Sequence, residues 1–209
     1  MKNLFKQPVV ILANGEFPNH ETPLGLLSLA GTVICADGSA NILRSLNLKP
    51  HIIIGDLDSI AKKHSYEGLI VDDSNQSNTD LEKAIEFTML NSIKQVTVLG
   101  AVGNRDDMSF VNIQLLFKYF EKIGIKIITD YFSIECIIGK KIFKSFCGQR
   151  VSLATNDHSC TITTSNLKYS ISGKIDPSVS LISNESLGDR FTLSSSEPLI
   201  VFRGHNNKL

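Results

Sequence analysis

Four aspartates stand where short apolar segments end or where a predicted helix begins: Asp37, Asp56, Asp58 and Asp80. The first three follow segments that are apolar on both faces, as the strands of a buried parallel sheet are. In an open parallel sheet, ligands bind at the carboxyl ends of the strands, near the point where the strand order reverses. We therefore expect the four carboxylates to meet at one edge of the sheet.

A cation is needed to hold such carboxylates together, because like charges repel one another. Mg²⁺ prefers oxygen ligands and usually binds one or two carboxylates together with waters and substrate phosphates. There it can stabilise the charge that develops during phosphoryl transfer. Glycines in the loops after the strands support a phosphate site, because a backbone without side chains lets phosphate approach its amides. These glycines are Gly15, Gly38, Gly55 and Gly103.

Taken singly, some of these residues have simpler explanations. Asp80 is favourable at a helix start through the helix dipole alone, and Asp37-Gly38 is a common turn sequence. Asp56 and Asp58 are harder to explain in this way. They stand one residue apart after an apolar strand, and both can face a metal ion if the loop between them bends. The whole group is therefore more informative than any one member.

The composition excludes several kinds of partner. Lys and Arg together number 21, as do Asp and Glu, so no net charge attracts nucleic acid or an anionic membrane. No stretch approaches the length of a transmembrane helix. The four cysteines form no C-x-x-C pair, which fits reduced thiols in a reducing compartment. We expect a cytoplasmic protein that binds neither nucleic acid nor membrane.

The first two thirds of the chain alternate short apolar segments with amphipathic ones. This pattern predicts an α/β domain with a doubly wound, mostly parallel sheet. The predicted strands are Val9–Ala13, Thr32–Ala36, His51–Ile54, Leu69–Val71, Val96–Leu99 and Ile125–Thr129. Helical periodicity covers Thr79–Leu90 and Ser109–Phe120. Thr79 and Glu82 have the spacing of a capping box at the start of the first helix.

From about residue 134 the helical period is lost, and β-rich segments separated by turn signals follow. They predict a small antiparallel β-sandwich. Its expected segments are Val151–Ala154, Cys160–Thr164, Leu167–Ile171, Val179–Ile182, Phe191–Leu193 and Leu199–Phe202. We expect two domains, residues 1–138 and 139–209, that join near Gly139–Gly148.

Several common active-site motifs are missing from the sequence. There is no G-x-x-x-x-G-K-[ST] motif, which excludes a P-loop kinase. There is no G-x-S-x-G nucleophile elbow. The five histidines are scattered without ligand spacing, so a zinc site is not expected.

Segments along nearly the whole chain resemble, in order, the motifs of the thiamine pyrophosphokinase family. They are Ala36–Asn41, Pro50–Ser59, Gln76–Asp80, Gly100–Asp107 with Asn112, Asn166–Tyr169 and Ser180–Asn184. The resemblance implies that the diphosphate of ATP is transferred to the hydroxyl of thiamine, giving thiamine diphosphate and AMP. It also implies an N-terminal α/β domain that binds ATP and Mg²⁺, a C-terminal β-sandwich and a homodimer. Thiamine would lie between one subunit's α/β domain and the partner's β domain.

The resemblance also implies roles for individual residues. The catalytic carboxylates would be Asp37, Asp56, Asp58 and Asp80, and the last three of them would bind the metal. The nucleotide would be bound by Asn14, Gly15, Asp37, Gly38, Asn41, Arg105 and Asp107. Thiamine would be contacted by Gln76, Ser180 and Ser183. Which aspartate accepts the hydroxyl proton, Asp37 or Asp58, is left open.

Met108 departs from the family pattern, which has His or Gln directly after the aspartate that matches Asp107. A thioether cannot donate a hydrogen bond, so this position favours a thiamine or nucleotide sensor with weak catalysis as one alternative. The main enzymatic alternative is a diphosphokinase for another hydroxymethyl heterocycle, such as a pterin. A third, a nucleotide-sugar transferase that uses Asp56 and Asp58, lacks an accompanying acceptor motif.

Overall fold

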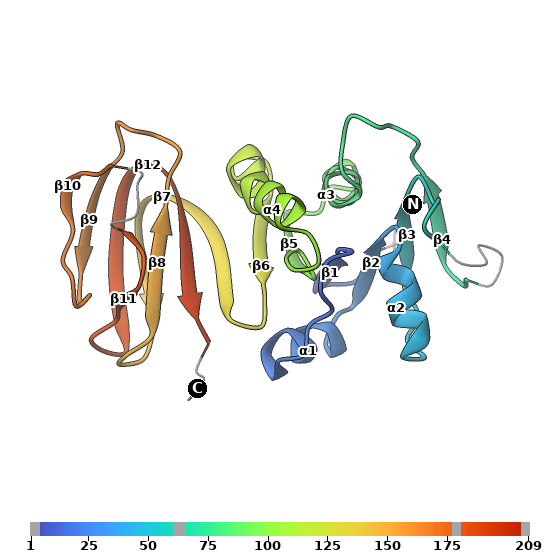
Figure 1. Ribbon diagram of the computed structural model, residues 1–209, viewed down its shortest axis with the longest axis horizontal. Coiled ribbons are helices and arrows are strands. Elements are labelled where there is room, and N and C mark those ends of the chain that lie inside the picture. Colours follow the sequence, from blue (N-terminus) through green and yellow to red (C-terminus); the bar gives the residue numbers. More distant parts are fainter. Residues whose placement is uncertain (1–4, 61–65, 177–180, 206–209) are drawn as a thin grey trace. The chain divides into compact units, whose positions relative to one another are not determined.

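The computed structural model describes residues 5–60, 66–176 and 181–205, and Figure 1 shows its helices and strands. The chain separates into two compact units, Met1–Asp130 and Tyr131–Leu209. The domain boundary expected between residues 138 and 139 lies inside strand β7 (Phe132–Lys144). The compact units therefore divide before this strand, not within it.

A parallel sheet with the strand order β6-β5-β1-β2-β3-β4 forms the centre of the first unit. Its strands are β1 (Val9–Leu12), β2 (Thr32–Ala36), β3 (Ile52–Gly55), β4 (Leu69–Asp72), β5 (Gln95–Leu99) and β6 (Gly124–Ile128). Each predicted strand is present, and no end differs from the prediction by more than one residue. Every residue of β1, β2 and β3 is buried, which explains why these strands are apolar on both faces.

Helices cover this sheet, and their bounds are α1 (Glu21–Ser28), α2 (Ser39–Ser45), α3 (Asp80–Leu90) and α4 (Asp106–Tyr119). The two helices predicted from periodicity correspond to α3 and α4. The sequence pattern missed α1 and α2, which are short, and α1 contains both Pro23 and Gly25. Side chains of α1 and α2 pack with β1, β2 and β3 in one apolar cluster that includes Leu27 and Leu43.

The start of α3 is only half a capping box. Thr79 Oγ1 accepts a hydrogen bond from Glu82 N at 3.2 Å, as predicted. The Glu82 carboxylate, however, turns toward α4, where it is bound by Lys118 and by the Tyr119 hydroxyl at 2.7 Å. The same hydroxyl lies 2.8 Å from Glu86 Oε1, and Glu86 Oε2 accepts from Asn78 Nδ2 at 2.9 Å. This network fastens α3, and the loop that precedes it, to α4.

The second unit is an antiparallel β-sandwich. In addition to β7 it contains β8 (Arg150–Ala154), β9 (Thr161–Ser165), β10 (Ser172–Lys174), β11 (Asn184–Glu185) and β12 (Arg190–Gly204). Strand β12 pairs with β7 along its length, with β9 through its first half and with β8 through its second half. The two long strands, β7 and β12, thus contribute to both layers of the sandwich. The apolar core of this unit lies between the two layers and is distinct from the core of the first unit.

Four predictions for the second unit differ from the structure. The segments Phe191–Leu193 and Leu199–Phe202 belong to one strand, β12. Gly139, expected at the domain junction, has φ 72° and lies in β7, where the register against β12 shifts. Leu167–Ile171 forms no strand and makes a single bridge, from Leu167 to Ser186. Of Val179–Ile182, the first two residues lie outside the described residues and the other two are not in a strand.

Within the described residues, no helix combines the length and the apolar character needed to cross a membrane.

Candidate active site

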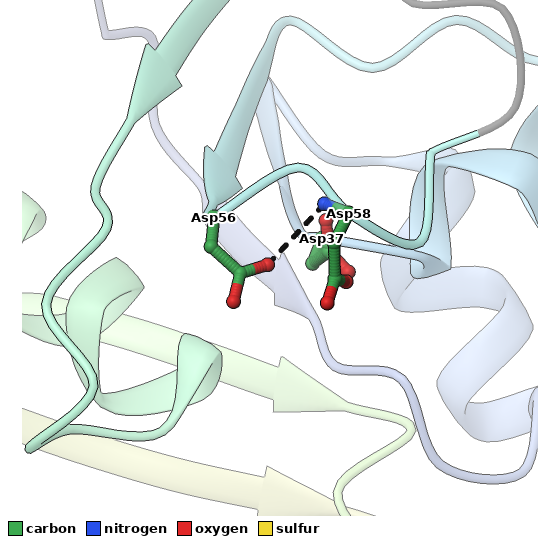
Figure 2. Close-up of side chains that lie close together, drawn as sticks. All are labelled: Asp37, Asp56 and Asp58. Carbon is green, nitrogen blue, oxygen red and sulfur yellow. Dashed lines mark hydrogen bonds between the residues drawn. The ribbon is translucent and has the colours of Figure 1, made fainter.

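Three carboxylates converge at the carboxyl ends of β2 and β3, which are neighbours in the sheet. Asp37, Asp56 and Asp58 each place a carboxylate oxygen within 4.8 Å of the others, and Figure 2 shows their side chains facing one another. Asp37 belongs to the turn after β2, and the other two belong to the loop after β3. We call these three residues the aspartate cluster.

The loop after β3 is bent at Leu57, which has φ 62°. A leucine in this left-handed conformation is strained by about 1–3 kcal/mol, but its side chain is only 4% exposed and is packed into the apolar cluster that also contains Leu43. The bend lets the Asp58 backbone amide donate to Asp56 Oδ1 at 3.3 Å (Figure 2). Burial of Leu57 therefore fixes the conformation in which both aspartates face the same site.

Asp37 is the buried member of the aspartate cluster, with 2% exposure. Its backbone amide donates to Ile54 O at 2.8 Å, which holds it against β3. Its Oδ1 atom has no hydrogen-bond partner among the residues that the structure describes. Burial raises the pKa of this carboxyl, and the neighbouring charges of Asp80 and Asp56 act in the same direction. An unpaired buried carboxylate oxygen is costly, so this oxygen calls for a cation or a proton donor bound beside the aspartate cluster.

Asp56 is held by Gln76, whose Nε2 donates to Asp56 Oδ2 at 3.1 Å. This hydrogen bond, together with the one from the Asp58 amide, lowers the pKa of the Asp56 carboxyl. Gln76, expected to contact the substrate, thus lies beside the aspartate cluster.

Asp80 lies outside the aspartate cluster and is bound by a lysine. Lys83 Nζ donates to Asp80 Oδ1 at 3.0 Å, and the Lys83 side chain is only 3% exposed. Burial alone would lower the pKa of this ammonium group, but the hydrogen bond and charge of Asp80, with the charges of Asp56 and Asp73, outweigh it and raise the pKa. The sequence analysis missed Lys83. The available signal was a lysine three residues after Asp80, on the same side of the helix and beside its apolar stripe.

A pocket of about 230 Å³ adjoins Asp80. Its walls come from the loop after β1, the end of β2, the loop after β5 and the N-terminal halves of α3 and α4. From β1 the chain continues to β2 on one side of the sheet, whereas from β5 it continues to β6 on the other side. The strand order therefore reverses between β1 and β5, and the pocket lies at the switch point where open α/β sheets bind ligands. We call it the switch-point pocket.

Among the expected nucleotide-binding residues, Asn14, Gly15 and Arg105 line the switch-point pocket. Asp107 is not among its lining residues. Its carboxylate accepts from Arg105, with Nη2 to Oδ2 at 2.5 Å and Nε to Oδ1 at 3.1 Å. Met108 does line the pocket.

Gly38 and Asn41 lie outside the pocket lining. Asn41 Nδ2 donates to Ser59 O at 2.8 Å, and Asn41 Oδ1 accepts from the Tyr66 hydroxyl at 2.8 Å. The side chain therefore supports the end of the loop that carries Asp58. A Cβ atom at Gly38 would lie 2.8 Å from Asn14 Nδ2, so the glycine permits a close approach between the loops after β1 and β2.

The expected thiamine contacts in the C-terminal part lie in the second unit. Ser183 is exposed and has φ 61°, and its amide donates to Ser152 Oγ at 3.0 Å. Ser180 lies outside the described residues.

The fold and the site together define an α/β protein with converging carboxylates and a pocket at the carboxyl edge of its parallel sheet. The chain belongs to the thiamin pyrophosphokinase family: the model of that family's catalytic domain matches residues 25–129. Thiamine pyrophosphokinase 1 of Oryza sativa subsp. japonica is 31% identical over 198 residues, covering 78% of this chain and 73% of the relative.

Solved structures share the fold over almost the whole chain. Thiamin pyrophosphokinase from Candida albicans aligns with a TM-score of 0.81 at 19% identity, covering 94% of this chain and 89% of that one. Thiamine pyrophosphokinase from Bacillus subtilis aligns with a TM-score of 0.79 at 23% identity, covering 95% and 99%. The two-unit architecture is therefore that of these structures.

Gly55 allows the aspartate cluster to form, because a Cβ atom at this position would lie 2.7 Å from Asp37 Cβ. We expect Gly55→Ala to displace Asp37 and to destabilise the protein by about 1–3 kcal/mol. It should also weaken the binding of Mn²⁺, used here as a probe of the divalent cation site. Thermal unfolding and calorimetric Mn²⁺ titration measure the two effects. Gly25→Ala is the matched control, since nothing lies within 4 Å of the added atom. Mn²⁺ binding that is unchanged in Gly55→Ala would show that the position of Asp37 does not affect the cation site.

Proposed function

We propose that this chain catalyses the Mg²⁺-dependent transfer of the diphosphate of ATP to the hydroxyl of thiamine, giving thiamine diphosphate and AMP. The observation that carries the proposal is the aspartate cluster beside the switch-point pocket in a member of the thiamin pyrophosphokinase family. Converging carboxylates next to a pocket at the switch point of the sheet suit a metal–phosphate complex.

Asp56 and Asp58 would hold the metal ion, with Asp80 as the third expected ligand. Lys83 occupies Oδ1 of Asp80, so the other carboxylate oxygen, or a water, would face the ion. When bound, Mg²⁺ would neutralise the negative charge that develops on the phosphates. Gln76 would keep the Asp56 carboxylate turned toward the site through its hydrogen bond.

Asp37 is our proposed proton acceptor for the thiamine hydroxyl. Its Oδ1 atom is buried and has no hydrogen-bond partner within the described parts of the chain. Its pKa is raised, chiefly by burial, which brings the carboxylate closer to the basicity that general base catalysis requires. The remaining acceleration would come from positioning the hydroxyl in line with the β-phosphorus, as in other phosphoryl transfers.

Thiamine recognition and assembly belong to the same proposal. Gln76, Ser180 and Ser183 would contact thiamine, Arg105 and Asp107 would position the nucleotide, and Gly38 and Asn41 would shape the loops around the phosphates. A homodimer would bring the β-sandwich of one subunit to the α/β unit of the other, in the cytoplasm. Sedimentation of the purified chain tests the dimer.

Product identification tests the reaction. The protein is incubated with ATP, Mg²⁺ and thiamine, and in parallel with hydroxymethylpterin, and the products are separated by mass. We expect AMP and thiamine diphosphate. ADP with thiamine monophosphate would overturn diphosphoryl transfer, and a product from the pterin alone would overturn the substrate. Thiamine binding without any product would indicate a sensor, and Met108→His would then be the next variant to assay.

A further inference from the structure

Asn112 on α4 has a buried acceptor that the protein leaves unused. The residue is 5% exposed and lines the switch-point pocket. Its Nδ2 atom donates to Ala101 O at 2.7 Å. This bond fixes the orientation of the amide, because the amide oxygen would repel the Ala101 carbonyl if the group were reversed. Asn112 Oδ1 is thereby turned away from Ala101, and it has no hydrogen-bond partner in the described parts of the chain.

An unsatisfied buried acceptor costs about 1–3 kcal/mol, and such groups in native structures call for an explanation. Buried side-chain polar atoms without a partner occur at only three described residues, Asp37, Asn112 and Arg203. Asp37 belongs to the aspartate cluster, so two of the three lie at the candidate active site. A ligand that brings a hydrogen-bond donor into the pocket would remove the cost at Asn112.

The other walls of the pocket indicate what kind of group carries this donor. Apolar side chains contribute much of the lining: Ala13, Ala36, Leu81, Ala101 and Met108. Such walls suit the flat, apolar faces of a heteroaromatic ring, and a few placed polar atoms then give orientation and specificity. Met108 adds a polarisable thioether, which makes favourable contacts with aromatic rings. A heteroaromatic ring with a hydrogen-bond donor on its edge, within reach of Asn112, would fit both the apolar walls and the unpaired Asn112 Oδ1.

We propose that Asn112 Oδ1 accepts a hydrogen bond from the exocyclic amino group of adenine and so makes the site select adenine over 6-oxopurines. This inference rests on the proposed function, in which the switch-point pocket binds ATP. A 6-oxopurine places a carbonyl oxygen where adenine has its amino group, so two acceptors would face each other. A site built for a donor rejects a ligand that lacks it, because the buried acceptor is then left unpaired.

The test compares the binding of AMP and IMP, which differ at this position of the base, by titration calorimetry without metal or thiamine. The wild-type protein is expected to bind AMP about 10- to 100-fold more tightly than IMP. Asn112→Leu, which removes the acceptor at similar volume, should reduce the ratio to within about 3-fold, mainly by weakening AMP. Thr88→Val is the matched control. Its hydroxyl is buried in α3 and bonds Ile85 O at 2.6 Å, away from the pocket lining, so its AMP/IMP ratio should stay at the wild-type value.

Asn112→Ala provides a second variant if Asn112→Leu does not fold, and thermal unfolding is recorded for each. Equal affinity of the wild-type protein for AMP and IMP, no binding of either, or an unchanged ratio in both Asn112 variants would overturn the inference. An Asn112 variant that keeps the wild-type AMP/IMP ratio but weakens AMP more than 2′-deoxy-AMP would move the contact to the ribose and overturn the base assignment. Intact AMP selectivity in a protein that makes no thiamine diphosphate would refute the proposed function alone.

Discussion

Replacement of Asp56 or Asp58 by asparagine is expected to lower turnover at least about 10²-fold, the scale for loss of one transition-state contact. Each substitution keeps the shape of the side chain and removes one negative charge from the aspartate cluster. Asp56 is partly exposed and Asp58 is exposed, and in both variants the buried ammonium of Lys83 keeps its direct partner Asp80. We therefore expect the melting temperature to change little, and steady-state assays of thiamine diphosphate formation should report a loss in kcat.

Asp189→Asn is the matched control for these two variants. Asp189 is exposed in the second unit and pairs only with its neighbour Arg190 among the ion pairs of the described residues. Its replacement should leave both turnover and melting temperature unchanged. Near-normal turnover in Asp56→Asn and in Asp58→Asn would refute the assignment of the aspartate cluster as the catalytic metal site. A lower melting temperature with a parallel loss of activity would instead assign these residues a structural role.

The sheet could be predicted from the sequence because its central strands are buried on both faces. Continuous apolar runs such as Val9–Leu12 and Ile52–Gly55 have few alternatives to a buried parallel strand. The position of the site follows from the same pattern, since loops at the carboxyl ends of parallel strands share one edge. Asp37, Asp56 and Asp58 could therefore be grouped without coordinates.

Features that depend on contacts between distant segments were not predictable. A glycine between two apolar segments usually indicates a turn. Gly139 instead lies at an irregularity within β7, because its partner strand β12 continues past it. Glu82 matched a capping box, but Tyr119 and Lys118 on α4 bind its carboxylate more favourably. In each case a tertiary partner overrides a correct local signal.

The polar atoms that we propose to decide specificity could not be predicted either, because their roles also depend on contacts between distant segments. The sequence marks Asn112 as part of a motif, but only the bond to Ala101 O shows which end of its amide is used. Likewise, a lysine in an amphipathic helix is normally exposed. Lys83 is buried because carboxylates from Asp80, Asp56 and Asp73 surround its ammonium group, and the structure was needed to show this arrangement.

Variants of the ion pair between Asp80 and Lys83 can distinguish a structural role of Asp80 from a catalytic one. We expect the single and the double variant to differ in stability. Asp80→Asn should leave the buried ammonium of Lys83 without its ion partner, at a cost of about 3 kcal/mol. For a chain of this size the melting temperature should fall by about 6–12 °C, and turnover should be lost. Adding Lys83→Met removes the unpaired charge, so the double variant should regain most of the lost stability.

The activity of the double variant decides what Asp80 does. If Asp80 binds the metal ion or the phosphates, Asp80→Asn combined with Lys83→Met remains inactive although it is stable. If turnover returns together with the melting temperature, Asp80 served only to neutralise Lys83 and is not a ligand. A melting temperature of the single variant equal to that of the wild-type protein would show instead that Asp56 and Asp73, whose charges also act on Lys83, suffice to hold the ammonium. We expect a stable, inactive protein, because Asp80 both opens α3 and borders the switch-point pocket.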